Sequence, residues 1–218
     1  MSSGGRVFTW FDRRYRLRGP LEYQLNKRIP PHLNWTNCFG GITFICFGVQ
    51  VITGILLAFY YKPTLAEAYP SVLRIMETVP FGAFVRGLHA WTANVMILMA
   101  IIHMVKVFWI NAYRPPREFT WVSGVFLFFV TITFGFSGYL LPMNQLSYWA
   151  TTVGTQIAGA FPVVGPYAQS FLVGGAKIGA ETLTRFYALH VLVLPAAILV
   201  LLVGHFSMIR RQGISQPL

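Results

Sequence analysis

Four long runs of apolar residues follow one another along the chain. They extend roughly from Trp35 to Tyr61, from Phe84 to Ile110, from Phe119 to Leu141 and from Phe186 to Ile209. A helix needs about 20 such residues to cross a bilayer. We therefore predict an all-α fold built on a bundle of four transmembrane helices, which together form a domain over residues 35–209.

The remaining segments are predicted to lie at the membrane surface. Within the basic N-terminal segment, residues 1–34, aromatic side chains recur over Val7–Tyr15 beside two arginines. This pattern is typical of a helix on the membrane surface, and a disordered basic tail is the alternative. The connection between the third and fourth runs spans about 40 residues, for which short surface helices are expected rather than a structureless loop. Residues 210–218 form a C-terminal tail.

Composition and charge support a membrane protein. Of 218 residues, 55% are apolar and 11% are charged, whereas soluble domains carry about 25% charged residues. The net charge of +11 sits in clusters between the apolar runs, which does not indicate nucleic-acid binding. Twelve of the 17 Lys and Arg residues lie on the side that holds both termini. The positive-inside rule therefore places both termini on the cytoplasmic side.

Histidines give the clearest chemical signal. His89 and His103 lie 14 residues apart in the second run, and His190 and His205 lie 15 apart in the fourth. At 100° and 1.5 Å per residue, each pair occupies broadly one helix face, with its members about 21–22 Å apart. Because the second and fourth helices run in the same direction, His89 should meet His190, and His103 should meet His205.

Two such pairs favour two stacked haems b inside the bundle. A single intramembrane histidine often makes only an interhelical hydrogen bond, but four such polar groups in lipid indicate function. Facing neutral imidazoles suit bis-histidine haem ligation. Zinc and a proton relay are weaker alternatives, because no cysteine or carboxylate lies at ligand spacing within the runs.

The two runs without histidines share the same spacing in their glycines. Gly40 and Gly54 lie 14 residues apart in the first run, as do Gly124 and Gly138 in the third. Glycine lets a flat ligand or another helix come close. Ordinary helix packing is the alternative explanation.

Several motifs are similar to those of one known family. Through them the chain resembles cytochrome b6, the four-span N-terminal half of the cytochrome b of Rieske–cytochrome b complexes. The matching stretches are Ile29–His32, Cys38–Gly41, Phe59–Pro63, Arg86–His89, Pro116–Trp121, Thr182–Tyr187 and Ile209–Leu218.

The resemblance implies roles for particular residues. The four histidines would ligate two haems b, the four glycines would pack at the haems, and Arg86 and Arg117 would contact propionates. Cys38 would hold a third, c-type haem by one thioether, with Arg210 in contact. From chemistry alone, Cys38 and Cys46 are also ordinary small hydrophobes, and no C-x-x-C-H motif is present.

The function implied is that of a subunit, incomplete alone, of a quinol:cytochrome c (or other electron-acceptor) oxidoreductase that couples quinol oxidation to proton translocation. The implied partners are a Rieske iron–sulfur protein, a three-span C-terminal subunit resembling subunit IV and a c-type cytochrome, in a homodimeric complex. The family's Pro-Glu-Trp-Tyr motif is absent from this chain and belongs to that C-terminal half. No side chain is predicted to be catalytic.

Departures from the photosynthetic pattern favour a bacterial form that oxidises menaquinol rather than plastoquinol, in the cytoplasmic membrane. They occur at Ala90, Leu141–Gln145 and Val153–Ala158. Two rival functions remain. One is a haem-b anchor that passes electrons between quinone and a peripheral dehydrogenase or reductase without a Rieske partner, and the other is a non-redox four-helix scaffold.

Overall fold

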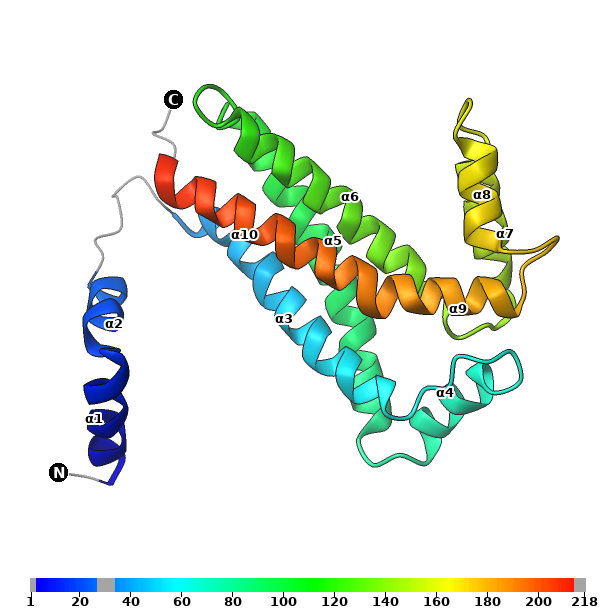
Figure 1. Ribbon diagram of the computed structural model, residues 1–218, viewed down its shortest axis with the longest axis horizontal. Helices are drawn as coiled ribbons and strands as arrows, with labels where there is room; N and C mark the ends of the chain where they lie inside the picture. The colour runs from blue at the N-terminus through cyan, green and yellow to red at the C-terminus, as the bar shows by residue number, and fades with distance from the viewer. Residues whose placement is uncertain (1–2, 27–33, 214–218) are drawn as a thin grey trace. The chain divides into compact units, whose positions relative to one another are not determined.

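The structure is a computed structural model that describes residues 3–26 and 34–213 (Figure 1). The chain divides into two compact units, with the boundary between Thr36 and Asn37. The first contains α1 (Ser3–Tyr15) and α2 (Arg18–Leu25). The aromatic segment predicted to be a surface helix lies within α1.

The second unit consists of helices joined by non-helical connections. After the short helix η1 (Trp35–Cys38), its elements are α3 (Phe39–Ala58), α4 (Ala68–Glu77), α5 (Gly82–Trp109), α6 (Glu118–Leu140), α7 (Gln145–Gly159), α8 (Gly165–Val173), α9 (Ala180–Ala188), η2 (Leu189–Val193) and α10 (Leu194–Gln212). Within the described residues, four helices are long and apolar enough to cross a membrane: Trp35–Ala58, Gly82–Trp109, Glu118–Leu140 and Ala180–Gln212. The predicted four-span fold is confirmed.

The spans pack as two pairs that share one core. α3 lies along α5, and α6 lies along α10. Midway along the bundle, Cys46 and Phe47 of α3 contact Met96 of α5 and Ile198 of α10, and Leu127 of α6 covers them. Cys46 is buried in this core, as its interpretation as ordinary packing predicted.

The connections on one end of the bundle are more helical than expected. The segment between α6 and α9 forms the hairpin α7–α8, which accounts for the predicted short helices, and α4 lies at the same end (Figure 1). The sequence interpretation missed α4, whose buried residues Ala68, Val72 and Ile75 follow helical spacing over only ten residues. A stretch that short has too few turns to be recognised by periodicity.

The fourth span is not a regular helix around His190. Leu189–Val193 forms a π-helix, in which the Leu194 N–H bonds the Leu189 carbonyl five residues earlier. Pro195 follows directly, and a proline ring crowds the carbonyl four residues before it. A π-bulge accommodates one additional residue within a helix. It therefore explains why the spacing in this span is 15 residues rather than 14.

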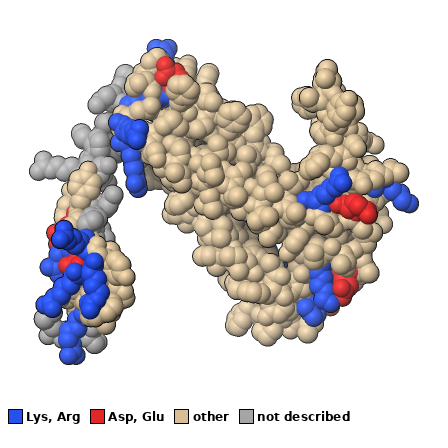
Figure 2. Space-filling view, in the orientation of Figure 1, with Lys and Arg blue, Asp and Glu red and all other residues tan. Residues whose placement is uncertain are grey.

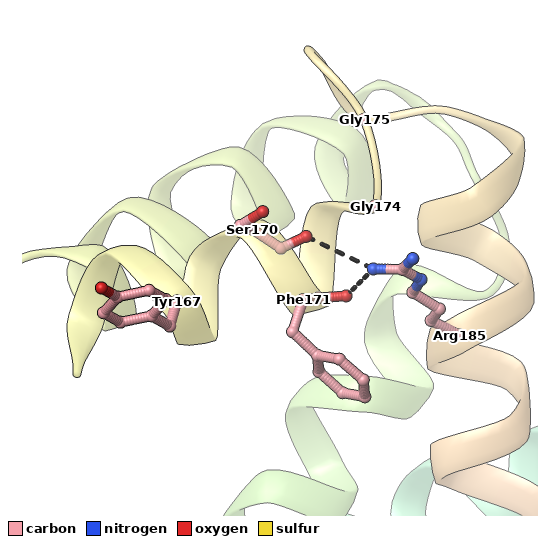
Figure 3. Close-up of a pocket in the computed structure, with 6 residues that line it drawn as sticks. All are labelled: Tyr167, Ser170, Phe171, Gly174, Gly175 and Arg185. Atoms are coloured by element: carbon pink, nitrogen blue, oxygen red, sulfur yellow. Dashed lines mark hydrogen bonds between the residues drawn. The ribbon is translucent and has the colours of Figure 1, made fainter.

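Two side chains of α9 hold the hairpin against the bundle. Arg185 Nη1 donates to the carbonyls of Ser170, at 3.3 Å, and Phe171 (Figure 3). Thr182 Oγ1 donates to the Val173 carbonyl at 2.6 Å. These carbonyls belong to the last turn of α8, where carbonyls lack partners further along the helix, although the Ser170 carbonyl also accepts the Gly174 N–H at 2.9 Å. A guanidinium is favourable there because the helix dipole is negative at its C-terminus. Arg185 also lines an open cavity of about 480 Å³ over α8.

The substitution Thr182→Val tests this anchor. Thr182 is fully buried, and it also accepts the N–H of Gly179. Its loss leaves the carbonyl of buried Val173 and the N–H of partly buried Gly179 unpaired, so the free energy of unfolding should fall by about 1–3 kcal/mol. Thr184→Val, at an exposed position of the same helix, should change it by less than about 0.5 kcal/mol. Thermal unfolding in detergent measures both, and equal effects would contradict the anchor.

Candidate functional site: two histidine pairs

The structure brings the four histidines together as two pairs between α5 and the fourth span. The rings of His89 and His190 have centroids 6.4 Å apart and planes inclined at 70°. His103 and His205 lie close enough to interact electrostatically. The pairs follow the combination expected from two parallel helices, with one pair toward each end of the bundle.

Three of the four imidazoles bond a hydroxyl group through Nδ1. The pairs are His89 with Thr53 at 2.8 Å, His190 with Ser137 at 3.0 Å and His205 with Ser123 at 2.8 Å. Each hydroxyl already donates its proton to a backbone carbonyl three or four residues earlier in its own helix. The oxygen must therefore accept from Nδ1–H. This tautomer leaves the Nε2 lone pair free for a metal.

Each imidazole also lies against a glycine of the neighbouring helix. A Cβ atom built on the glycine would come within 2.6–3.4 Å of the imidazole Cε1. The pairs are Gly40 with His103, Gly54 with His89, Gly124 with His205 and Gly138 with His190. The glycines thus make room for the imidazoles themselves. The sequence interpretation had expected a flat ligand or a helix backbone in this place.

The hydroxyl partners were missed in the sequence, although a signal for them exists. Thr53, Ser123 and Ser137 each directly precede one of the four glycines, so a hydroxyl–glycine dipeptide occurs three times within the apolar runs. The fourth glycine follows Phe39, which has no hydroxyl group. Gln50 was also missed. It is buried in α3, and its Nε2 donates to the His89 carbonyl at 2.6 Å.

The three arginines predicted to contact haem differ in their surroundings. Arg117, at the start of α6, has a buried Nε atom without a hydrogen-bond partner among the described residues. Such an orphaned donor fits an anionic group from outside the chain. Arg86 is partly buried, and its guanidinium lies 3.4 Å from the Met76 sulfur. Arg210 is exposed in the last turn of α10.

Cys38 has an exposed free thiol at the start of α3. Lys106 of α5 donates to Oδ1 of the adjacent Asn37 at 2.7 Å. Lys106 lies one turn beyond His103, and Gly40, which touches His103, lies two residues beyond Cys38. Cys38 is therefore at the level of the His103–His205 pair.

Known proteins are similar to this chain in sequence and in fold. The sequence profile of the family described as Cytochrome b/b6/petB matches residues 24–213. The chain belongs to the cytochrome b/b6 family. The cytochrome b6 of Gloeobacter violaceus is 47% identical over 213 residues, which cover 98% of this chain and 99% of that protein. That of Auxenochlorella protothecoides is 46% identical with the same coverage.

A solved chain of a hyperthermophilic respiratory Complex III is also similar, with a TM-score of 0.88 and 35% identity. The match covers 96% of this chain and 56% of the Complex III chain. As a member of the cytochrome b/b6 family, the protein is the cytochrome b subunit of a bc-type quinol-oxidising complex. This membership favours that function over the dehydrogenase anchor and the non-redox scaffold.

The cofactors of cytochrome b6 are two haems b and a third haem attached covalently to a cysteine, and the residues present fit the two haems b. A haem b held by two histidines needs only two protein ligands, and each pair supplies two imidazoles. Two imidazoles that share one metal at about 2 Å each have ring centroids about 6 Å apart, which agrees with the His89–His190 separation of 6.4 Å. No cluster of three or more His, Cys, Asp or Glu side chains suited to a metal occurs in the described residues.

Gly138→Ala tests whether the glycines set the imidazole positions. The added methyl group would lie 2.6 Å from Cε1 of His190, so the ring must move. Overpacking of this kind costs about 1–3 kcal/mol, and haem affinity at the His89–His190 pair should fall about tenfold. Gly48→Ala, where the methyl group meets nothing within 4 Å, is the control. Visible spectra report haem content, and an unchanged spectrum in Gly138→Ala would contradict this role.

Proposed function

We propose that this chain carries electrons across the membrane, with one haem b held by His89 and His190 and the other by His103 and His205. The observation that supports this most directly is the pairing of the four imidazoles at two levels of one bundle. At each level the imidazoles come from parallel helices, and hydrogen bonds leave Nε2 free on three of the four. Haem supplies one-electron chemistry at each level.

The protein's own contribution is to fix the positions of the imidazoles and to exclude water from the interior of the bundle. The hydroxyls of Thr53, Ser123 and Ser137 fix ring orientation, and such partners also tune ligand basicity. Met96 and Ile198 lie midway in sequence between the two histidines of their spans, and Phe47 of α3 packs with them in one core. This core is apolar and packed, so it keeps water out of the space between the levels.

We propose that quinol is oxidised at the end of the bundle nearer His89 and His190, with the other subunits of the complex. The partners would be a Rieske iron–sulfur protein, a three-span subunit resembling subunit IV and a c-type cytochrome, in a homodimer. Membership of the cytochrome b/b6 family supports these partners. Val153–Ala158 and Leu141–Gln145 favour menaquinol over plastoquinol.

Topology follows from the distribution of charge. We propose that residues 35–209 lie in a bacterial cytoplasmic membrane or another energy-conserving membrane. The basic segment 1–34 and the tail 210–218 would face the cytoplasm. Twelve of 17 basic residues on that side support this orientation.

Cys38 would attach the third haem through one thioether bond. Its thiol is exposed and free, and it lies at the level of the His103–His205 pair. The chain offers no further histidine within the described residues for this haem, since the four described histidines are paired. Arg210 and Lys106, at the same end of the bundle, would balance propionate charge.

Ligand-pair variants test the electron path. Alanine at His103 or His205 should remove one haem component from the spectrum of the purified complex, and alanine at His89 or His190 the other. In the His205→Ala complex, added quinol should still reduce the remaining haem b, but quinone reduction at the far side should stop. If His89→Ala and His205→Ala lost the same component, the proposed pairing would be wrong.

Mass spectrometry of the peptide that contains Cys38 tests whether a haem is attached there. The tryptic peptide that contains Cys38 should carry the mass of one haem, and the chain should stain for haem after denaturing electrophoresis. Cys38→Ser should abolish the stain and leave both haems b in place, and Cys46→Ser is the matched control that keeps the stain. An unmodified Cys38 peptide in the purified complex would refute the attachment.

A further inference from the structure

The helix α1 has a surface that nothing in the proposed electron path uses. Val7, Phe8, Phe11 and Tyr15 recur at three- and four-residue steps, so they share one face of the helix. All four side chains are exposed. An apolar stripe on a charged helix normally has a covering partner.

The arginines of α1 lie outside this stripe. By helix geometry Arg14 lies at its edge, and Arg6 and Arg13 lie on the opposite side of the helix. All three are exposed, and Figure 2 shows basic side chains gathered over the segment that Figure 1 labels α1. The guanidinium of Arg14 lies 3.8 Å from the ring centroid of Trp10 and donates to the Trp10 carbonyl. A guanidinium stacked on an indole at the edge of an apolar stripe suits the boundary between lipid chains and headgroups.

The acidic side chain of α1 does not neutralise these arginines. Asp12 accepts the backbone N–H of Arg18 at 2.6 Å and lies 4.0 Å from its Nε atom. It is therefore engaged with the start of α2. Among the described residues, no ion pair involves Arg6, Arg13 or Arg14. The helix thus presents uncompensated positive charge at the edge of its aromatic face, from Arg14, and on its opposite side, from Arg6 and Arg13.

We propose that α1 binds anionic phospholipid headgroups, with its aromatic face in the lipid and its arginines on the phosphates. Charge complementarity selects this occupant, because basic residues at a membrane surface are attracted to anionic lipids. A zwitterionic membrane surface would accept the aromatic side chains but would offer the arginines no net negative charge. Since α1 precedes the first span and carries charges along its length, it stays on the membrane face where that span begins.

Hydrogen–deuterium exchange on the complete chain in its complex tests the proposal. The complex is placed in nanodiscs of phosphatidylcholine alone or mixed with phosphatidylglycerol. Exchange of the α1 amides should slow about tenfold when phosphatidylglycerol is present, and high salt should reverse the effect. Equal exchange of the α1 amides in the two lipids would overturn the proposal. Protection in detergent as strong as that with phosphatidylglycerol would also overturn it, because it would indicate that α1 packs against protein.

Charge variants separate phosphate binding from apolar contact. The triple variant Arg6→Gln, Arg13→Gln, Arg14→Gln should lose the protection given by phosphatidylglycerol. Replacement of the same three residues by lysine should retain most of it, because the charge remains. Lys177→Gln, which removes one exposed positive charge outside α1, should leave it unchanged. Protection that survives the glutamine variant would overturn the proposal.

Discussion

The structure depends on how an imidazole is held inside an apolar bundle. A polar ring among lipid-facing helices is costly unless its hydrogen-bonding atoms are satisfied. Here the imidazole edge fits against a glycine of the adjacent helix, and three of the four Nδ1 atoms bond the hydroxyl directly before that glycine. Each histidine helix therefore requires a partner helix at close distance, and the pairs α3–α5 and α6–α10 follow from this requirement.

The same arrangement determines which nitrogen is available for chemistry. Because Thr53, Ser123 and Ser137 give their own protons to backbone carbonyls, they accept from Nδ1 and fix the tautomer. The free Nε2 atoms are then the only strong metal-binding atoms of these rings. Ligand geometry is built in the folded chain by groups that never touch the metal, as is usual for histidine ligands.

Much of this could be predicted from the sequence. The spans follow from the length of the apolar runs, and the pairing of His89 with His190 follows from helix direction and spacing. The glycines were found, but not what they contact, since spacing alone does not distinguish a ring from a backbone. The hydroxyl groups were missed because serine and threonine are common in membrane helices. The π-helix at His190 was missed because local widening leaves no periodic pattern, although the 15-residue spacing reflects it.

The central claim is that each imidazole pair binds one iron through Nε2. A high-resolution electron cryo-microscopy map of the purified, haem-loaded complex tests it most directly. The account predicts one iron between His89 and His190 and another between His103 and His205. Each iron should be bonded to two Nε2 atoms, with the Thr53, Ser123 and Ser137 hydroxyls still bonded to Nδ1. Iron bonded to Nδ1, or a haem that leaves one of these histidines unligated, would contradict it.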